Sequence, residues 1–251
     1  MSYTLYNADC LDILPTLDAG SVDAVICDPP YGTTACKWDS VIPFAPMWAG
    51  IKRVLKPRGA CVLFGSQPFT SALVMSNPKW FRYEWVWDKV NTTGFLDVNR
   101  KPMKRHENII VFASGEHTYN PIVSGSAVKS FGARSRGLSS VYGAFGADKQ
   151  HGIGYPQSII KCQRPTNITD VQFGMHPTQK PLALLEYLVK TYTNEGDVVL
   201  DFAFGSGTTG HACGNLARRF IGIEKDEHYY AIAEERIATA YEPLRMMQVA
   251  V

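Results

Sequence analysis

The chain has 251 residues, 45% of them hydrophobic and 19% charged, which is the composition of an ordinary globular protein with one large domain. It contains no run of about 18 apolar residues, and its N-terminus lacks a basic region followed by an apolar stretch, so neither a transmembrane helix nor a secretory signal is expected. The six cysteines are scattered without a CxxC pair, which argues against a disulfide framework or a zinc site and favours a cytoplasmic protein.

The net charge of +2 hides an uneven distribution along the chain. Residues 89–175 hold 11 Lys and Arg against 5 Asp and Glu, a net charge of +6, whereas the remainder holds 14 against 18, a net charge of −4. A basic middle predicts a polyanionic partner, although a solvated loop region that happens to be basic would look the same. The candidate contacts are Lys89, Arg100, Lys101, Lys104, Arg105, Lys129, Arg134 and Arg136.

Residues 1–115 alternate apolar runs with helical patterns. Strands are predicted at 22–28, 59–65, 83–89 and 107–113, with helices at 43–57 and 67–77. Strands separated by helices indicate βαβ units and a parallel sheet. Trp85 and Trp87 lie two positions apart in one predicted strand, so we expect both to pack on the same face of the sheet.

Residues 116–175 break this rhythm, because they are rich in Gly, Ser, Asn and Gln and have no sustained periodicity. A loop-rich insertion of this length inside a compact domain is usually functional or disordered. The alternation resumes after it. A helix is predicted at 180–193, a strand, glycine turn and helix at 197–217, a strand at 219–226 and a closing helix at 227–242.

The stretch "DFAFGSG" at 201–207 follows a strand and precedes a helix. Such a turn lets a ligand approach the backbone and the free N–H groups of the helix. The spacing matches neither GxGxxG nor a P-loop, which argues against a dinucleotide or a phosphate. Glu224 ends the next strand, 19 residues after Gly205, where an acid typically holds ribose hydroxyls. A nucleoside without a pyrophosphate, such as S-adenosylmethionine, fits this pattern; a structural turn with a surface acid is the alternative.

The stretch "DPPY" at 28–31 ends the first long strand. Pro29 and Pro30 stiffen the backbone, so the Asp28 carboxylate and the Pro29 carbonyl can both accept hydrogen bonds from an exocyclic amine, while Tyr31 can stack on the ring that carries it. A base in duplex DNA would have to be flipped out to reach this pocket. A rigid turn capped by Asp28 would also explain the prolines.

Three motifs in this order resemble the β group of the amino-methylating DNA methyltransferases: "DPPY" at 28–31, "HPTQKP" at 176–181 and "DFAFGSGTTG" at 201–210. The resemblance implies a Rossmann-like, S-adenosylmethionine-dependent methyltransferase fold, α/β with a mostly parallel sheet, helices on both faces and a circularly permuted motif order. It implies one domain over 1–251, with a catalytic half at 1–115, a target-recognition insertion at 116–175 and a cofactor-binding half at 176–251. The family often has Asp-Pro-Phe where this chain has Asp201-Phe202-Ala203-Phe204.

The resemblance also assigns roles to residues. Asp28, Pro29, Pro30 and Tyr31 are the expected catalytic residues. Asp9 is expected at the adenine side of the cofactor, Glu224 at the ribose, and the loop from His176 to Lys180 near the methionine carboxylate. The full cofactor set is Asp9, Cys10, Asp28, His176, Thr178, Gln179, Lys180, Asp201, Phe202, Phe204, Gly205, Ser206, Gly207, Thr208, Thr209, Glu224 and Lys225. No metal ligand is expected.

The implied activity is transfer of a methyl group from S-adenosylmethionine to the exocyclic N6 amine of a flipped adenine in double-stranded DNA. Asp as the first motif residue is associated with adenine, and Ser with cytosine. N4-cytosine methylation and a catalytically silent DNA-binding regulator remain alternatives, whereas glutamine- and asparagine-methylating relatives carry Asn in place of Asp28. A bacterial or phage-infected cell is the expected setting. A homodimer and a cognate restriction endonuclease stay open as partners, and no membrane is expected.

Overall fold

The computed structural model describes residues 2–33, 39–123, 138–139, 143–144, 154–163 and 179–249. Its contacts divide the chain into two units, one with residues 1–120 and 158–251 and one with residues 121–157. The second unit contains the short antiparallel pair β6 (Leu138–Ser139) and β7 (Gly143–Ala144). No helix in the described ranges has the length and apolar character needed to cross a membrane.

The first unit is built on an eight-stranded sheet with the order β1-β10-β9-β2-β3-β5-β4-β8. The strands are β1 (Tyr3–Asn7), β2 (Val22–Cys27), β3 (Leu55–Gly65), β4 (Phe81–Thr93), β5 (Lys104–Phe112), β8 (Ile159–Lys161), β9 (Val198–Asp201) and β10 (Arg219–Glu224). Among these strands β5 alone runs against its neighbours, and every other pairing is parallel. The predicted mostly parallel α/β sheet is therefore confirmed.

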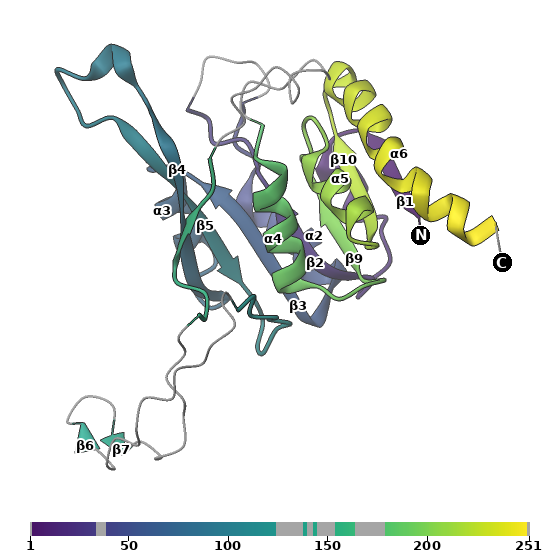
Figure 1. Cartoon of the computed structure of the whole chain (residues 1–251), viewed down its shortest axis with the longest axis horizontal. Helices are drawn as coiled ribbons and strands as arrows, with labels where there is room; N and C mark the ends of the chain where they lie inside the picture. Colours follow the sequence, from purple (N-terminus) through teal and green to yellow (C-terminus); the bar gives the residue numbers. More distant parts are fainter. Residues whose placement is uncertain are drawn as a thin grey trace. The chain divides into compact units, whose positions relative to one another are not determined.

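Helices cover both faces of this sheet, as predicted. One face carries α1 (Cys10–Ile13), α2 (Phe44–Val54) and α3 (Phe69–Ser76), and the other carries α4 (Leu182–Tyr192), α5 (Thr208–Asn215) and α6 (Glu227–Val249) (Figure 1). Alternate strand residues point to opposite faces. In β2, Val25 and Cys27 pack with α2, while Ala24 and Ile26 belong to the core beneath α4.

The reversed strand β5 results from a direct connection. Residues 94–103, with the 3₁₀ turn η1 (Phe95–Asp97), join β4 to β5 without a helical crossover, so the two strands form an antiparallel hairpin. Figure 1 shows this hairpin reaching past the ends of the other strands. Trp85 and Trp87 are 3% and 1% exposed and pack in the core with α4, as their shared face predicts.

Candidate active site

The carboxyl ends of four parallel strands meet at one edge of the sheet and carry acids there. Asp9 follows β1, Asp28 follows β2, Asp201 ends β9 and Glu224 ends β10. In open α/β sheets this edge is where ligands bind. A cavity of about 810 Å³ opens at it and is lined by all four acids. Residues far apart in the sequence thus contribute to a single cavity.

Most of the residues that the sequence assigned to the site line this cavity. They are Asp9, Cys10, Asp28, Pro29, Pro30, Tyr31, Gln179, Lys180, Asp201, Phe202, Phe204, Gly205, Ser206, Thr208, Thr209, Glu224 and Lys225. Gly207 instead begins α5 as its N-terminal cap. His176 and Thr178 lie outside the described residues.

The glycine turn after β9 depends on two glycines. Gly205 and Gly207 have φ angles of 53° and 76°, values that residues other than glycine rarely adopt. A Cβ on Gly207 would also lie 2.8 Å from Ala233 Cβ on α6. The turn lines the cavity and leads directly into the N-terminus of α5. The sequence therefore specifies this turn locally and the packing of α6 enforces it.

Glu224 is fixed by the backbone on both of its oxygens. The N–H of Gly205 donates to Glu224 Oε2 at 2.8 Å, and the N–H of Asp226 donates to Oε1 at 2.8 Å. Burial raises the pKa of Glu224, although these backbone hydrogen bonds oppose the rise. A carboxylate has about four lone-pair positions, so Glu224 keeps acceptor capacity for a hydroxyl-bearing ligand.

Asp201 is almost completely enclosed, with 2% exposure, and accepts a 3.2 Å hydrogen bond from the N–H of Ala203. Burial raises the pKa of Asp201 to about 7. Nearby, Phe204 packs 6.0 Å from the Tyr230 ring, which is possible because position 222 is glycine: a Cβ there would lie 2.6 Å from Phe204. These groups form a partly apolar wall beside the glycine turn.

At the rim of the cavity, Asp9 links β1 to β10. Its carboxylate caps α1 through the N–H of Leu11 at 3.0 Å and pairs with Lys225 Nζ at 2.9 Å. The backbone hydrogen bond from Leu11, helped by Lys225, lowers the pKa of Asp9. Asp9 therefore stays ionised at neutral pH, with a cation beside it.

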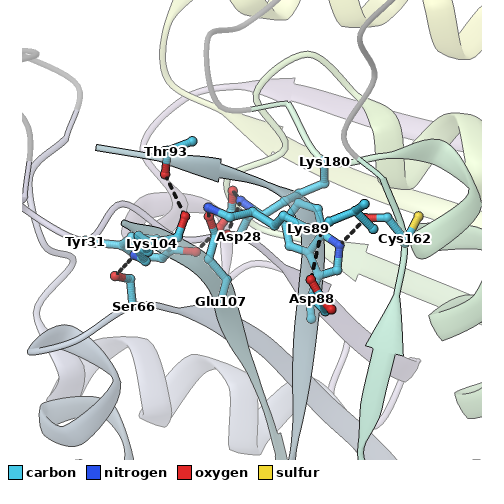
Figure 2. A network of polar contacts seen from close by, with 12 residues as sticks. Asp28, Tyr31, Ser66, Asp88, Lys89, Thr93, Lys104, Glu107, Cys162 and Lys180 are labelled. Atoms are coloured by element: carbon cyan, nitrogen blue, oxygen red, sulfur yellow. Dashed lines mark hydrogen bonds and ion pairs between the residues drawn. The ribbon is translucent and has the colours of Figure 1, made fainter. Parts of the chain in front are cut away.

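A second group of charges surrounds Asp28 (Figure 2). The Tyr31 hydroxyl donates to Asp28 Oδ1, and the Lys180 ammonium donates to Oδ2. Lys180 Nζ also lies 3.4 Å from Glu107 Oε2, while Lys89 Nζ lies 3.1 Å from Glu107 Oε1. Two carboxylates and two ammonium groups thus alternate along the cavity wall.

Burial and the neighbouring opposite charges act in opposite directions on the pKa values of this group. Burial raises the pKa of Asp28, with Lys180 opposing the rise. Burial also works to raise the pKa of Glu107, but Lys180 and Lys89 together lower it. The pKa of Lys180 is raised because Asp28 and Glu107 outweigh the effect of burial. Lys180 is therefore held as a cation between two acids.

Several residues have surroundings other than those that the sequence suggested. Lys180 lines the cavity, and its ammonium contacts Asp28 and Glu107, two partners that the sequence did not indicate; its place near the methionine carboxylate of a cofactor stays a prediction. Lys89, expected among the surface contacts of a polyanion, is 3% exposed and lines the cavity. Lys104 also lines the cavity and donates to the Ser66 hydroxyl.

The remaining basic candidates lie on the β4–β5 hairpin or beyond the described ranges. Arg100 is exposed, Lys101 pairs with Asp97 at 3.0 Å, and Arg105 pairs with Asp88 at 2.7 Å. The three basic residues of the insertion, Lys129, Arg134 and Arg136, lie outside the described residues.

Phe64, Ser66, Trp87 and Glu107 are among the lining residues to which the sequence gave no role in the site. A signal existed for Glu107, because it is an acid directly before the apolar run "NIIVF" of β5. It pairs across the ladder with Trp87. Phe64 carried no such signal, since an apolar residue in a buried strand is expected to be core.

Comparisons with known proteins give matches over most of the chain. A family model described as DNA methylase, N6_N4_Mtase, matches residues 22–235. The Type II methyltransferase M.HpaI of Haemophilus parainfluenzae is 26% identical over 258 residues, which cover 96% of this chain and 76% of that protein.

Solved structures share the fold over nearly the whole chain. The crystal structure of an M1.HpyAVI–SAM complex matches with a TM-score of 0.63 and 26% identity, covering 94% of this chain and 98% of that one. The PvuII DNA methyltransferase, described as cytosine-N4-specific, matches with a TM-score of 0.68 and 16% identity, covering 97% and 93%. The second likeness concerns the fold alone.

Proposed function

Because this chain belongs to the N6/N4 DNA methylase family, we propose that it transfers a methyl group from S-adenosylmethionine to the N6 amine of a flipped adenine in double-stranded DNA. One observation carries the proposal: the Asp28 carboxylate and the Gly205–Glu224 turn line the same cavity of about 810 Å³. That volume is in the range of ligand sites and can hold two reactants side by side.

The residues around the glycine turn fit the cofactor. Glu224 and Asp9 are acceptors suited to ribose hydroxyls and an adenine amine, and Phe204 offers an apolar surface. The turn lacks the spacing of a pyrophosphate site, which suits a nucleoside without phosphates. When bound, S-adenosylmethionine supplies a methyl group whose bond to sulfur breaks, leaving the electron pair on sulfur, as the amine nitrogen forms its new bond.

At the other end of the cavity, Asp28 acts on the amine. The lone pair of an aromatic amine is delocalised into the ring, so the nitrogen is a poor nucleophile. Hydrogen bonds to the Asp28 carboxylate and the Pro29 carbonyl would localise that pair and stabilise the positive charge that develops on nitrogen. The nitrogen must also lose one proton, which Asp28 can take as the acceptor of that N–H.

This chemistry requires no covalent intermediate on the protein. Cys27 lies directly before Asp28, but its side chain is 0% exposed in the core with α2. Burial raises the pKa of its thiol well above the ordinary value, so it stays a neutral thiol. We therefore assign Cys27 to packing.

The β4–β5 hairpin supports an approach to DNA from the same edge. Lys89 and Lys104, near the base of the hairpin, line the cavity, and Arg100 and Lys101 stand exposed nearer its tip. Cations on this connection suit a phosphate backbone. The flipped base would then enter the cavity beside the hairpin.

The direct test is methylation of DNA by the purified protein. Tritiated S-adenosylmethionine and plasmid DNA are incubated with wild type and with Asp28→Ala, and the DNA is digested to nucleosides. Label in N6-methyladenine with wild type alone is the expected result. Label in N4-methylcytosine would replace adenine by cytosine as the target. Label at the wild-type rate with Asp28→Ala would refute the assignment of the site.

A further inference from the structure

Lys180 is shared unequally between two carboxylates. Its ammonium donates to Asp28 Oδ2, while Glu107 Oε2 lies 3.4 Å away. Glu107 Oε2 is buried and accepts no hydrogen bond, whereas the other oxygen, Oε1, accepts one from Lys89. A buried carboxylate oxygen without a hydrogen bond is costly. Glu107 therefore offers an acceptor that Lys180 has not taken.

Asp28, by contrast, accepts a hydrogen bond on each of its oxygens. The Tyr31 hydroxyl is on one oxygen and the Lys180 ammonium on the other. A carboxylate that neutralises an ammonium group has less attraction left for positive charge that develops on a substrate amine. In this arrangement, the acceptor that methyl transfer needs is weakened by its own neighbour.

We propose that Lys180 shifts its hydrogen bond from Asp28 to Glu107 when the target amine enters, so that Lys180 and Glu107 are positioning residues that release Asp28 for the substrate. This inference rests on the proposed function. The shift is short, because Lys180 Nζ is already 3.4 Å from Glu107 Oε2. It keeps the Lys180 ammonium beside a carboxylate before and after the base binds.

The surroundings of Lys180 suit such a shift. Its ammonium lies 5.1 Å from the centre of the Phe64 ring and 5.9 Å from that of Tyr31. Aromatic faces attract a desolvated cation without directing it strongly, so the ammonium remains stabilised between its two positions. Lys180 directly precedes Pro181, the N-cap of α4, which anchors its backbone while the side chain moves.

The titratable groups that face Asp28 come from five places. They are Tyr31 of its own turn, Cys27 of β2, Glu107 of β5, Asp201 of β9 and Lys180 before α4. Lys89 of β4 and Lys104 of β5 act on Glu107 in turn. Lys180 is the cation in contact with Asp28, so its removal leaves Asp28 facing the negative charge of Glu107.

The test measures single-turnover methyl transfer with saturating cofactor and DNA in Glu107→Gln, Lys180→Met and the double variant. In Glu107→Gln, Lys180 has no charged alternative and stays on Asp28. We therefore expect the methyl-transfer rate to fall by up to about tenfold, with unchanged DNA binding. Lys180→Met leaves Asp28 harder to ionise, so the acid limb of its pH–rate profile moves to higher pH. The double variant should be faster than Glu107→Gln, because the blocking ammonium is gone.

Matched controls are Lys190→Met, an exposed residue in the last turn of α4, and Glu234→Gln, on the exposed side of α6. Neither residue lines the cavity, so both variants should keep the wild-type rate. Should Lys180→Met fail to fold, Lys180→Arg is measured instead: its guanidinium can bridge both acids, which should slow transfer without moving the acid limb.

A wild-type rate in Glu107→Gln overturns the inference. So does a double variant no faster than Glu107→Gln, because a purely structural ion pair gives losses that persist or accumulate. Absence of methyl transfer in the wild-type protein would instead refute the proposed function, and the two failures are distinguishable.

Discussion

The backbone N–H of Gly205 donates a 2.8 Å hydrogen bond to Glu224 Oε2, which ties the turn after β9 to the end of β10. The second oxygen of Glu224 accepts from the N–H of Asp226. One carboxylate thus aligns two parallel strands at the edge where the cavity opens. The geometry of the proposed cofactor end depends on an acid that can accept on both oxygens.

Replacing Glu224 by Gln should therefore weaken S-adenosylmethionine binding. A glutamine amide has one acceptor oxygen, so either Gly205 or Asp226 loses its partner and meets an N–H₂ group instead. We expect the affinity for S-adenosylmethionine, measured by calorimetric titration, to fall by up to about tenfold. Glu234→Gln, on the exposed side of α6, serves as the control and should bind like wild type. Equal affinities in both variants would remove Glu224 from the cofactor site.

Replacing Asp28 by Ala should separate binding from chemistry. The variant keeps the glycine turn and Glu224, so its affinity for the cofactor should stay within about twofold of wild type. Its methyl-transfer rate should fall by about 100-fold or more, because the acceptor for the developing charge is gone. Comparable losses in both measurements would mean that Asp28 supports the cavity as a whole.

Neutralising the β4–β5 hairpin should reduce the salt dependence of DNA binding. Arg100→Ala with Lys101→Ala removes two cations, and the slope of log K against log salt should flatten by about 0.9 per lost phosphate contact. Lys190→Ala, at an exposed residue in the last turn of α4, is the matched control. An unchanged slope would place the DNA elsewhere. The same measurement applies to Arg134 and Arg136, which lie outside the described residues.

Asp201 should make stability depend on pH. Burial raises the pKa of Asp201 from its ordinary value of 3.8 to about 7, so at intermediate pH the folded protein holds a proton that the unfolded chain releases. The free energy of unfolding then falls as pH rises, by about 2 kcal/mol between pH 5 and pH 7 for this group alone. Urea unfolding should show the fall in wild type and a smaller one in Asp201→Asn.

Parallel slopes of stability against pH in the two proteins would contradict this prediction. Glu224 contributes in the same direction, because burial raises its pKa as well. A residual slope in Asp201→Asn is therefore expected, and the comparison between the two proteins carries the result.

Local sequence predicted the two turns because their residues decide directly which backbone angles are accessible. The prolines after Asp28 restrict φ, whereas the glycines at 205 and 207 allow the positive φ angles that other residues rarely adopt. The strands beside both turns are apolar enough to be recognised. The sheet followed from the alternation of strands and helices. Both inferences needed only neighbours in the chain.

The contacts of Lys180 could not be predicted from its neighbours in the chain. Its two acids lie on β5 and after β2, and their approach depends on β5 being inserted between β3 and β4 in reverse. Periodicity gives no sign of strand direction, so the sequence left the direction of this strand open. Lys89 was misplaced for a related reason: a lysine in a strand is usually exposed, and the partner that allows its burial, Glu107, is 18 residues away.

Because β5 is reversed, the length of the β4–β5 connection can change independently of the register of the core strands. Since β4 arrives at the catalytic edge and β5 departs from it, residues 94–103 project from that edge, away from the packed layers. Insertions or deletions in this connection change how far the protein reaches without shifting the register of a core strand. The connection can thus change in length while Glu107, paired with Trp87 in the ladder, keeps its place.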